Sequence, residues 1–307
     1  MNKIVLCGCH ELGIEIINHL IEKNIQISHI VSLTKKQAEK YKVSGYASYK
    51  NLSKKYGIPI YYPKTFSLKD EADLEFFQKE KFDLLILGGW QRLIPNEVLT
   101  KLKIGGLGLH GSGDFLPKGR GRSPVNWSII EGKTRFILHL FKISPGVDDG
   151  GIISFKQCEI NEWDSCRTLY YKFAVMAKRM LEEEIPKIFK QGILEKKQTG
   201  KPTFYPKRSP EDGLIDWKKK VNEIHNFVRA ITKPYPGAFS YLNGKKIILW
   251  KCQPFDKKIK YQTAKNGEIV EKFSSGDFIV KCKDGGLLVT DYEGDIEQNL
   301  IFTSNVP

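Results

Sequence analysis

Short, continuous apolar runs recur through the first two thirds of the chain, separated by segments with helical spacing. The runs at 3–7 (KIVLC), 26–33, 58–62 and 83–87 are typical of strands buried in a parallel sheet. Segments 11–21, 49–56, 68–80, 124–130 and 165–191 predict helices, and 135–143 and 152–160 predict further strands. This alternation predicts an α/β fold with a doubly wound, mostly parallel Rossmann-like sheet.

The pattern changes in the last third of the chain. Residues 197–210 hold Pro, Gly, Lys and Thr without periodicity, and we interpret them as a linker. A helix is expected over 217–231, and then short strands at 238–242, 246–252, 267–273, 277–283 and 287–292. Asn243-Gly244 is a strong hairpin signal. We therefore expect a Rossmann-like domain over residues 1–200 and a carboxyl-terminal domain, a helix plus a small β-barrel, over residues 201–307.

The composition indicates a globular protein. Of the 307 residues, 41% are hydrophobic and 27% charged, and no apolar run reaches the length of a membrane span, so a cytoplasmic location is expected. The 6 cysteines do not suggest a disulfide framework in a chain of this length. Cys7 and Cys9 lack a second Cys/His pair at zinc spacing, so no metal site is expected.

The charge balance points to a partner that bears phosphate. Lys and Arg number 49 against 35 Asp and Glu, a net charge of +14. Such an excess suits a nucleotide or a nucleic acid, and it does not choose between them. The glycines after the first strand, Gly8 and Gly13, do not form the G-x-G-x-x-G fingerprint of dinucleotide binding.

The candidate chemistry lies in residues 105–153. His110 follows an apolar run in a glycine-rich segment that predicts a loop, and the pair Asp148-Asp149 follows an alternating strand. Each alone is ordinary, since a loop histidine is usually a surface group and Asp-Asp-Gly is common in turns. If the fold brings them together, an imidazole and a carboxylate can move a proton.

Several motifs then mark a resemblance that covers nearly the whole chain. They are His110-Gly111-Ser112, the run 116–122 (LPKGRGR), Asp148-Asp149-Gly150, and in the last third the runs 228–230 (VRA) and 234–239 (PYPGAF). With these the chain resembles the formyltransferases that use N10-formyltetrahydrofolate. The runs 120–127 and 225–230 look most like the branch that acts on nucleotide-linked amino sugars, the precursors of cell-surface polysaccharides such as lipopolysaccharide.

The resemblance implies roles for particular residues. His110 and Asp148 would be catalytic, and Asp149 is the alternative carboxylate. The folate would lie at the carboxyl end of the strand 83–87, against Gly88, Gly89, Trp90, Gln91, Arg92 and Leu93. The substrate would meet Gly111, Ser112, Arg120, Arg122, Arg229 and Tyr235. A homodimer is usual for such relatives.

Two departures from the family pattern bear on activity. Gly113 and Asp114 lengthen the spacing between His110 and Pro117 by two residues. The family's catalytic Asn stands two residues before the His, where this chain has Gly108. Loss of such an amide donor typically lowers the rate about 10² to 10³-fold. Gly108 therefore implies a slower enzyme, a replacement donor or a protein without activity. The replacement donor could be a backbone N–H, another side chain or a water in the room that glycine leaves.

Three functions follow from these observations. The first is formyl transfer to the amine of a nucleotide-linked amino sugar. The second is formylation of methionyl-tRNA, for which the basic segment 35–55 would contact the nucleic acid. The third is a folate- or nucleotide-binding homologue whose catalysis is impaired by Gly108.

Overall fold

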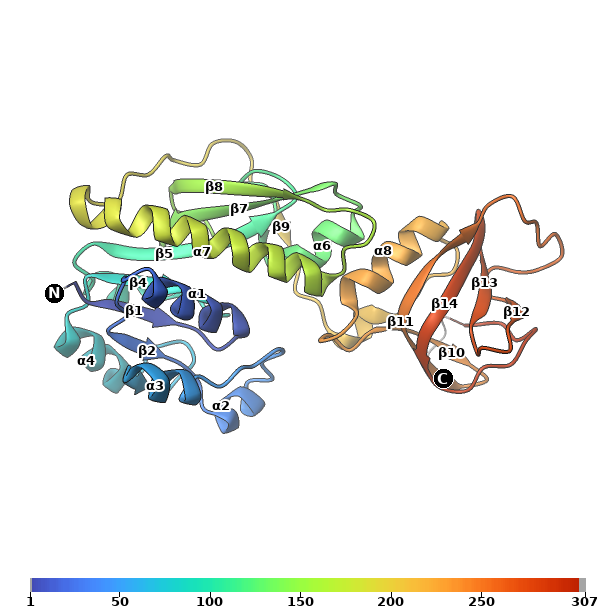
Figure 1. Cartoon of the computed structure of the whole chain (residues 1–307), viewed down its shortest axis with the longest axis horizontal. Helices are drawn as coiled ribbons and strands as arrows, with labels where there is room; N and C mark the ends of the chain where they lie inside the picture. Colours follow the sequence, from blue (N-terminus) through green and yellow to red (C-terminus); the bar gives the residue numbers. More distant parts are fainter. Residues whose placement is uncertain (1, 304–307) are drawn as a thin grey trace. The chain divides into compact units, whose positions relative to one another are not determined.

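The computed structural model describes residues 2–303, which form two compact units (Figure 1). The amino-terminal unit comprises the described residues up to Pro124 together with 135–158 and 171–205. The carboxyl-terminal unit comprises 125–134, 159–170 and the described residues from Pro206 onward. The chain therefore passes between the units several times, and the segment 197–210 is one of these passages.

The elements of the amino-terminal unit are β1 (Ile4–Cys7), α1 (Glu11–Glu22), β2 (His29–Val31), α2 (Lys35–Lys40), α3 (Lys50–Tyr56), β3 (Ile60–Tyr61), α4 (Glu71–Glu80), β4 (Leu84–Leu87), α5 (Asn96–Leu99), β5 (Gly105–Ser112), β6 (Arg120–Gly121), β7 (Arg135–Lys142), β8 (Ile152–Glu159), most of α7 (Cys166–Gln191) and β9 (Phe204–Tyr205). The carboxyl-terminal unit has α6 (Pro124–Ile130), the first turn of α7, the 3₁₀ helix η1 (Pro210–Gly213), α8 (Val221–Ile231), β10 (Ala238–Leu242), β11 (Lys245–Asp256), β12 (Ile269–Lys272), β13 (Phe278–Cys282) and β14 (Gly285–Glu293).

The sheet of the amino-terminal unit has the strand order β3-β2-β1-β4-β5-β7-β8. The pairs from β3 through β5 are parallel, and β7 runs antiparallel to β5. The predicted mostly parallel α/β sheet is confirmed. The order reverses at β1, with β2 on one side and β4 on the other, which is where open sheets of this kind bind ligands.

The continuous apolar sequence of β1 follows from its position in the middle of this sheet. Val5 and Cys7 belong to a core cluster with Phe77 and Phe82 on one face. Leu6 points the opposite way and lies beside Gly88. Because both faces of β1 are buried, none of its side chains needs to be polar.

The structure adds α2, a helix that the hydrophobic pattern of the basic segment did not predict. Thr34 caps it by accepting the Gln37 N–H at 3.2 Å, while the Gln37 side chain accepts the Thr34 N–H at 2.9 Å. This reciprocal capping box satisfies backbone donors that a helix start leaves open. The cue was the Thr-x-x-Gln spacing, not an apolar stripe.

The carboxyl-terminal unit is built on an antiparallel sheet with the order β10-β11-β14-β13-β12. Asn243 and Gly244 join β10 to β11 with positive φ at both residues, as a type I′ hairpin requires. Thr303 bridges Tyr241 at one edge of the sheet, and Ile301 bridges Glu268 beside the other. The last described residues thus link the two edges, which gives the sheet its barrel-like form.

Within residues 2–303 no helix combines the length and the apolar character that crossing a membrane requires.

Candidate functional site

His110 lies in strand β5, not in the loop that its glycine-rich surroundings predicted. The glycines of β5 are explained by the rings of β7, its antiparallel neighbour. A Cβ on Gly108 would lie 2.4 Å from Phe141 Cζ, and one on Gly111 would lie 2.2 Å from Phe136 Cζ. Glycine in a strand commonly marks such a close approach. The site histidine is consequently held on a rigid sheet.

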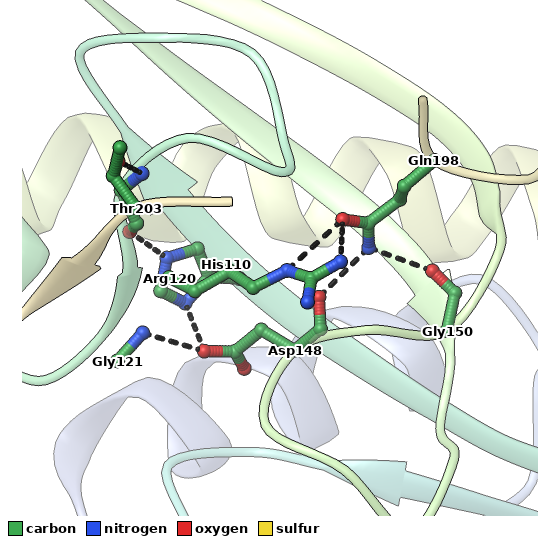
Figure 2. Close-up of polar contacts among 8 residues, drawn as sticks. His110, Arg120, Gly121, Asp148, Gly150, Gln198 and Thr203 are labelled. Atoms are coloured by element: carbon green, nitrogen blue, oxygen red, sulfur yellow. Dashed lines mark hydrogen bonds and ion pairs between the residues drawn. The ribbon is translucent and has the colours of Figure 1, made fainter. Parts of the chain in front are cut away.

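The imidazole of His110 lies between two oxygen atoms of the amino-terminal unit (Figure 2). Its Nδ1 is 3.3 Å from Asp148 Oδ2, and its Nε2 is 2.7 Å from the carbonyl oxygen of Gly119. A neutral imidazole has one N–H and can donate to only one of these acceptors at a time. The side chain of His110 is 6% exposed and that of Asp148 is 22% exposed. The fold therefore brings together the histidine and the first carboxylate of the Asp-Asp pair.

The two carboxylates of the turn after β7 face different partners. Asp148 Oδ2 accepts the Gly121 N–H at 2.9 Å in addition to its contact with His110. Asp149 instead accepts the hydroxyl hydrogen of Ser144. Asp148 has φ +48°, in the left-handed region that Asp tolerates better than most residues. A Cβ on Gly150 would lie 1.7 Å from the Lys142 carbonyl oxygen, so the close return of the turn to β7 requires glycine there.

The segment interpreted as a linker contributes two polar side chains to this arrangement, and the sequence interpretation missed both. Thr203 Oγ1 accepts the Gly119 N–H at 2.8 Å, and β9 pairs with β6. Gln198 contacts Arg120 and the turn that carries Asp148 (Figure 2). No periodicity marks either residue. The cue was the apolar pair Phe204-Tyr205 between prolines, which forms the short strand β9.

His139 is the cross-strand partner of His110 in β7 and has no exposed surface. Burial, and then the neighbouring His110, lower the pKa of His139 to about 4. An unfolded chain binds this proton at a pKa of about 6.5, so it protonates first as the pH falls. The contribution of His139 to stability is present above about pH 6.5 and is lost as the pH falls toward 4.

Because the unfolded chain binds a proton at His139 and the folded protein does not, we expect the free energy of unfolding to fall by about 2 kcal/mol between pH 7 and pH 5. In the variant His139→Phe the new ring would lie beside Phe115 and Phe155. Its free energy of unfolding should fall by about 2 kcal/mol less than that of the wild type over the same pH interval. Urea unfolding of both proteins at the two pH values measures the difference. His10 and His225, whose pKa values burial also lowers to about 4, contribute equally in both proteins. An equal loss in both proteins would contradict this assignment.

The space beside Gly108 is filled, which corrects one expectation from the sequence. The Phe141 ring stands where a side chain at position 108 would begin, and Phe141 itself is 5% exposed. A water in the room left by glycine is therefore not available in that direction.

The loop 88–93, predicted to hold the cofactor, follows β4 at the carboxyl end of the sheet. Gly89 has φ +84° and lies against His10, while Trp90 packs edge-on against Phe66 in the core. The Arg92 guanidinium lies 4.6 Å from the Phe66 ring centre, and its Nη1 donates to Gln91 O. Leu93 is 54% exposed. Gly88 is buried and donates its N–H to Cys7 O at 2.8 Å, while Gly89, Gln91 and Arg92 are partly exposed. Leu93 is thus the most exposed residue of the loop, and the indole of Trp90 belongs to the core.

The neighbouring turn after β1 is closed by a tyrosine. Tyr49 is buried and donates its hydroxyl to His10 O at 2.7 Å. A Cβ on Gly8 or Gly13 would lie 2.6 or 2.1 Å from that hydroxyl oxygen. At the turn where a glycine fingerprint would meet a dinucleotide phosphate, the Tyr49 hydroxyl therefore lies beside both glycines.

The predicted substrate residues of the amino-terminal unit differ in what they contact. Gly111 and Ser112 are buried in β5. Arg120 directs its guanidinium at Gln198 Oε1, with Nε at 3.2 Å and Nη2 at 2.6 Å. Arg122 is exposed, and its backbone N–H donates to Tyr205 O at 3.1 Å. Arg122 therefore offers the freer guanidinium of the two.

Arg229 and Tyr235 lie in the carboxyl-terminal unit. Nη1 of Arg229 donates to the carbonyl oxygens of Asn161, at 2.8 Å, and Asp164. Tyr235 shares a hydrogen bond of 2.7 Å with the Tyr170 hydroxyl. Both side chains thus have structural partners within their own unit.

Comparison with known proteins identifies the chain's relatives. The formyl transferase family model matches residues 1–185, and the model of the formyl transferase carboxyl-terminal domain matches residues 207–297. The chain is 33% identical over 286 residues to the bifunctional polymyxin resistance protein ArnA of Wigglesworthia glossinidia brevipalpis. That alignment covers 93% of this chain and 42% of the relative, so the chain spans well under half of that protein's length.

Solved structures share the fold. An N-formyltransferase from Helicobacter canadensis, in complex with folinic acid and dTDP-3-aminofucose, matches with a TM-score of 0.68 and 18% identity. The match covers 95% of this chain and 100% of that one. Methionyl-tRNA formyltransferase from Clostridium thermocellum matches with a TM-score of 0.59 and 17% identity, covering 85% and 96%.

Proposed function

The chain belongs to the formyl transferase family, and from this premise we propose that it transfers the formyl group of N10-formyltetrahydrofolate to the amine of a nucleotide-linked amino sugar. The observation that carries the proposal is the contact of the buried His110, on a strand of the central sheet, with Asp148. The 33% identity to ArnA and the amino-sugar ligand of the Helicobacter canadensis structure support the choice of acceptor.

The residues at the end of β4 fit a polar heterocycle such as a pterin. Among residues 2–303, the ring nitrogens His10 Nε2 and Trp90 Nε1 are buried beside this loop without a hydrogen-bond partner. The exposed Leu93 and the partly exposed Gly89, Gln91 and Arg92 would lie against the folate. When bound, N10-formyltetrahydrofolate supplies an activated formyl carbon for attack by the amine.

His110 would serve as the proton-transfer group. In the transfer, a bond would form between the amine nitrogen and the formyl carbon, the bond from that carbon to N10 would break, and one proton would pass from the amine toward N10. His110 Nε2 can take that proton after exchanging its contact with Gly119 O for the substrate. Asp148 at Nδ1 fixes the orientation of the ring and stabilises its charged form.

The guanidinium of Arg122 is the group that we assign to the phosphates of the nucleotide. It is exposed next to β6, and arginine binds phosphate oxygens through paired hydrogen bonds. Arg120 is tied to Gln198 and would hold the same segment in place.

Methionyl-tRNA is the alternative acceptor, favoured by the net charge of +14 and by the basic segment 35–55. Binding of tRNA would weaken steeply with salt, since each neutralised phosphate releases a counterion. Transfer to an amino sugar with few phosphates should change little.

A single-turnover assay with UDP-, GDP- and dTDP-linked amino sugars and with methionyl-tRNA distinguishes the acceptors. We expect a formylated product with one of the amino sugars and a rate that varies weakly between 50 and about 200 mM salt. Product with methionyl-tRNA alone would establish the alternative. Tight binding of folate and sugar without any product would indicate a homologue that lacks catalysis.

A further inference from the structure

The side chain of Gln198 touches both segments that surround His110. Its Nε2 donates to the carbonyl oxygens of Asp148, at 2.7 Å, and Gly150, at 2.8 Å. Its Oε1 accepts from Nε and Nη2 of Arg120. Figure 2 shows the amide between the Arg120 guanidinium and the turn that carries Asp148. A carboxamide has two N–H donors and two acceptor lone pairs, and all four are used here.

The turn that Gln198 contacts contains a residue in an unfavourable backbone conformation. Asp148 adopts φ +48°, a left-handed conformation that few residues other than glycine take up. Such conformations persist where the surroundings fix them. The two hydrogen bonds from Gln198 fix the carbonyl groups on either side of Asp149, and thereby the direction of the Asp148 side chain.

The amide oxygen of Gln198 binds Arg120, which belongs to the segment on the Nε2 side of His110. Arg120 stands between Gly119, whose carbonyl oxygen contacts His110 Nε2, and Gly121, whose N–H binds the Asp148 carboxylate. One amide therefore connects the carboxylate at Nδ1 of the histidine with the backbone at its Nε2.

From this geometry we infer that Gln198 is a positioning residue of the formyl transfer reaction. It holds Asp148 and the segment 119–121 at their places around the imidazole, and it acts on the reaction only through them. The inference rests on the proposed function of His110 and Asp148.

The test compares Gln198→Met, which removes both the donor and the acceptor, with Gln198→Glu, which keeps an acceptor for Arg120 and loses the donor to the two carbonyls. Gln191→Met, at the exposed end of α7, is the matched control. We expect both position-198 variants to lower kcat about 10 to 100-fold with KM for either substrate within about twofold, since small misplacements of catalytic groups have effects of that size. The control should match the wild type.

A second readout does not require activity. In protein labelled with ¹⁵N-histidine, the ring nitrogens of His110 should shift in Gln198→Met and stay unchanged in Gln191→Met. Unchanged kcat, or a loss of kcat that only follows the folded fraction, would overturn the inference, and so would unchanged His110 signals. If the wild type formylates no amine, the proposed function fails, and the ring signals still decide whether Gln198 positions His110.

Discussion

Replacing His110 by alanine is expected to lower kcat for formyl transfer about 10³-fold while the protein stays folded. The amine must lose a proton as its bond to the formyl carbon forms, and a positioned general base contributes about 10² to 10⁴-fold to such a step. His110 is the histidine of β5 with a carboxylate at one ring nitrogen, so its loss removes the acid–base group itself. Single-turnover formation of the formylated amine measures the effect.

The control and the partner residue sharpen this prediction. His19→Gln, at a histidine of α1 that pairs with Glu182, should keep wild-type activity. Asp148→Asn preserves an acceptor for the Gly121 N–H and suits the left-handed backbone, but it removes the charge that orients the imidazole. We expect kcat to fall about 10²-fold, the effect of misplacing a catalytic group. Because residues that act as one unit are not additive, the double variant should be no slower than His110→Ala. An alanine variant within tenfold of wild type would remove His110 from the mechanism.

The architecture could be predicted well because its strands and hairpin have signals in the local sequence. A strand that is buried on both faces has an unbroken apolar sequence, as β1 and β4 do. The hairpin between β10 and β11 is predicted by Asn243-Gly244. The meeting of His110 with the distant Asp148 could also be expected, because in the sequence the first follows an apolar run and the second follows an alternating strand.

The sequence misled where long-range packing sets the local structure. Glycines in β5 predicted a loop, whereas they make room for Phe141 and Phe136 of a strand that follows about thirty residues later. Gln198 carries no local signal at all, because its four hydrogen bonds connect segments about 50 and 80 residues away. Hydrogen bonds of that kind become visible only in three dimensions.

Restoring asparagine at position 108 is expected to fail by itself and to succeed once Phe141 is made smaller. Gly108 lies opposite Phe141 in the β5–β7 pair, and a Cβ at 108 would lie 2.4 Å from Phe141 Cζ. Overpacking of this sort typically costs about 1–3 kcal/mol. Gly108→Asn should therefore lower the free energy of unfolding by that amount, measured by urea titration, without raising kcat. A single variant as stable as the wild type would refute the packing explanation.

The double variant Gly108→Asn with Phe141→Ala separates packing from chemistry. With the ring gone, the new amide has room two residues before His110, on the same face of β5. A donor placed at the developing negative charge of the formyl oxygen is worth about 10² to 10³-fold in rate. We expect the double variant to exceed Phe141→Ala, its control for the cavity, by at least about 10²-fold in kcat. Equal rates would mean that another hydrogen-bond donor already serves this oxygen, and that Gly108 does not limit the enzyme.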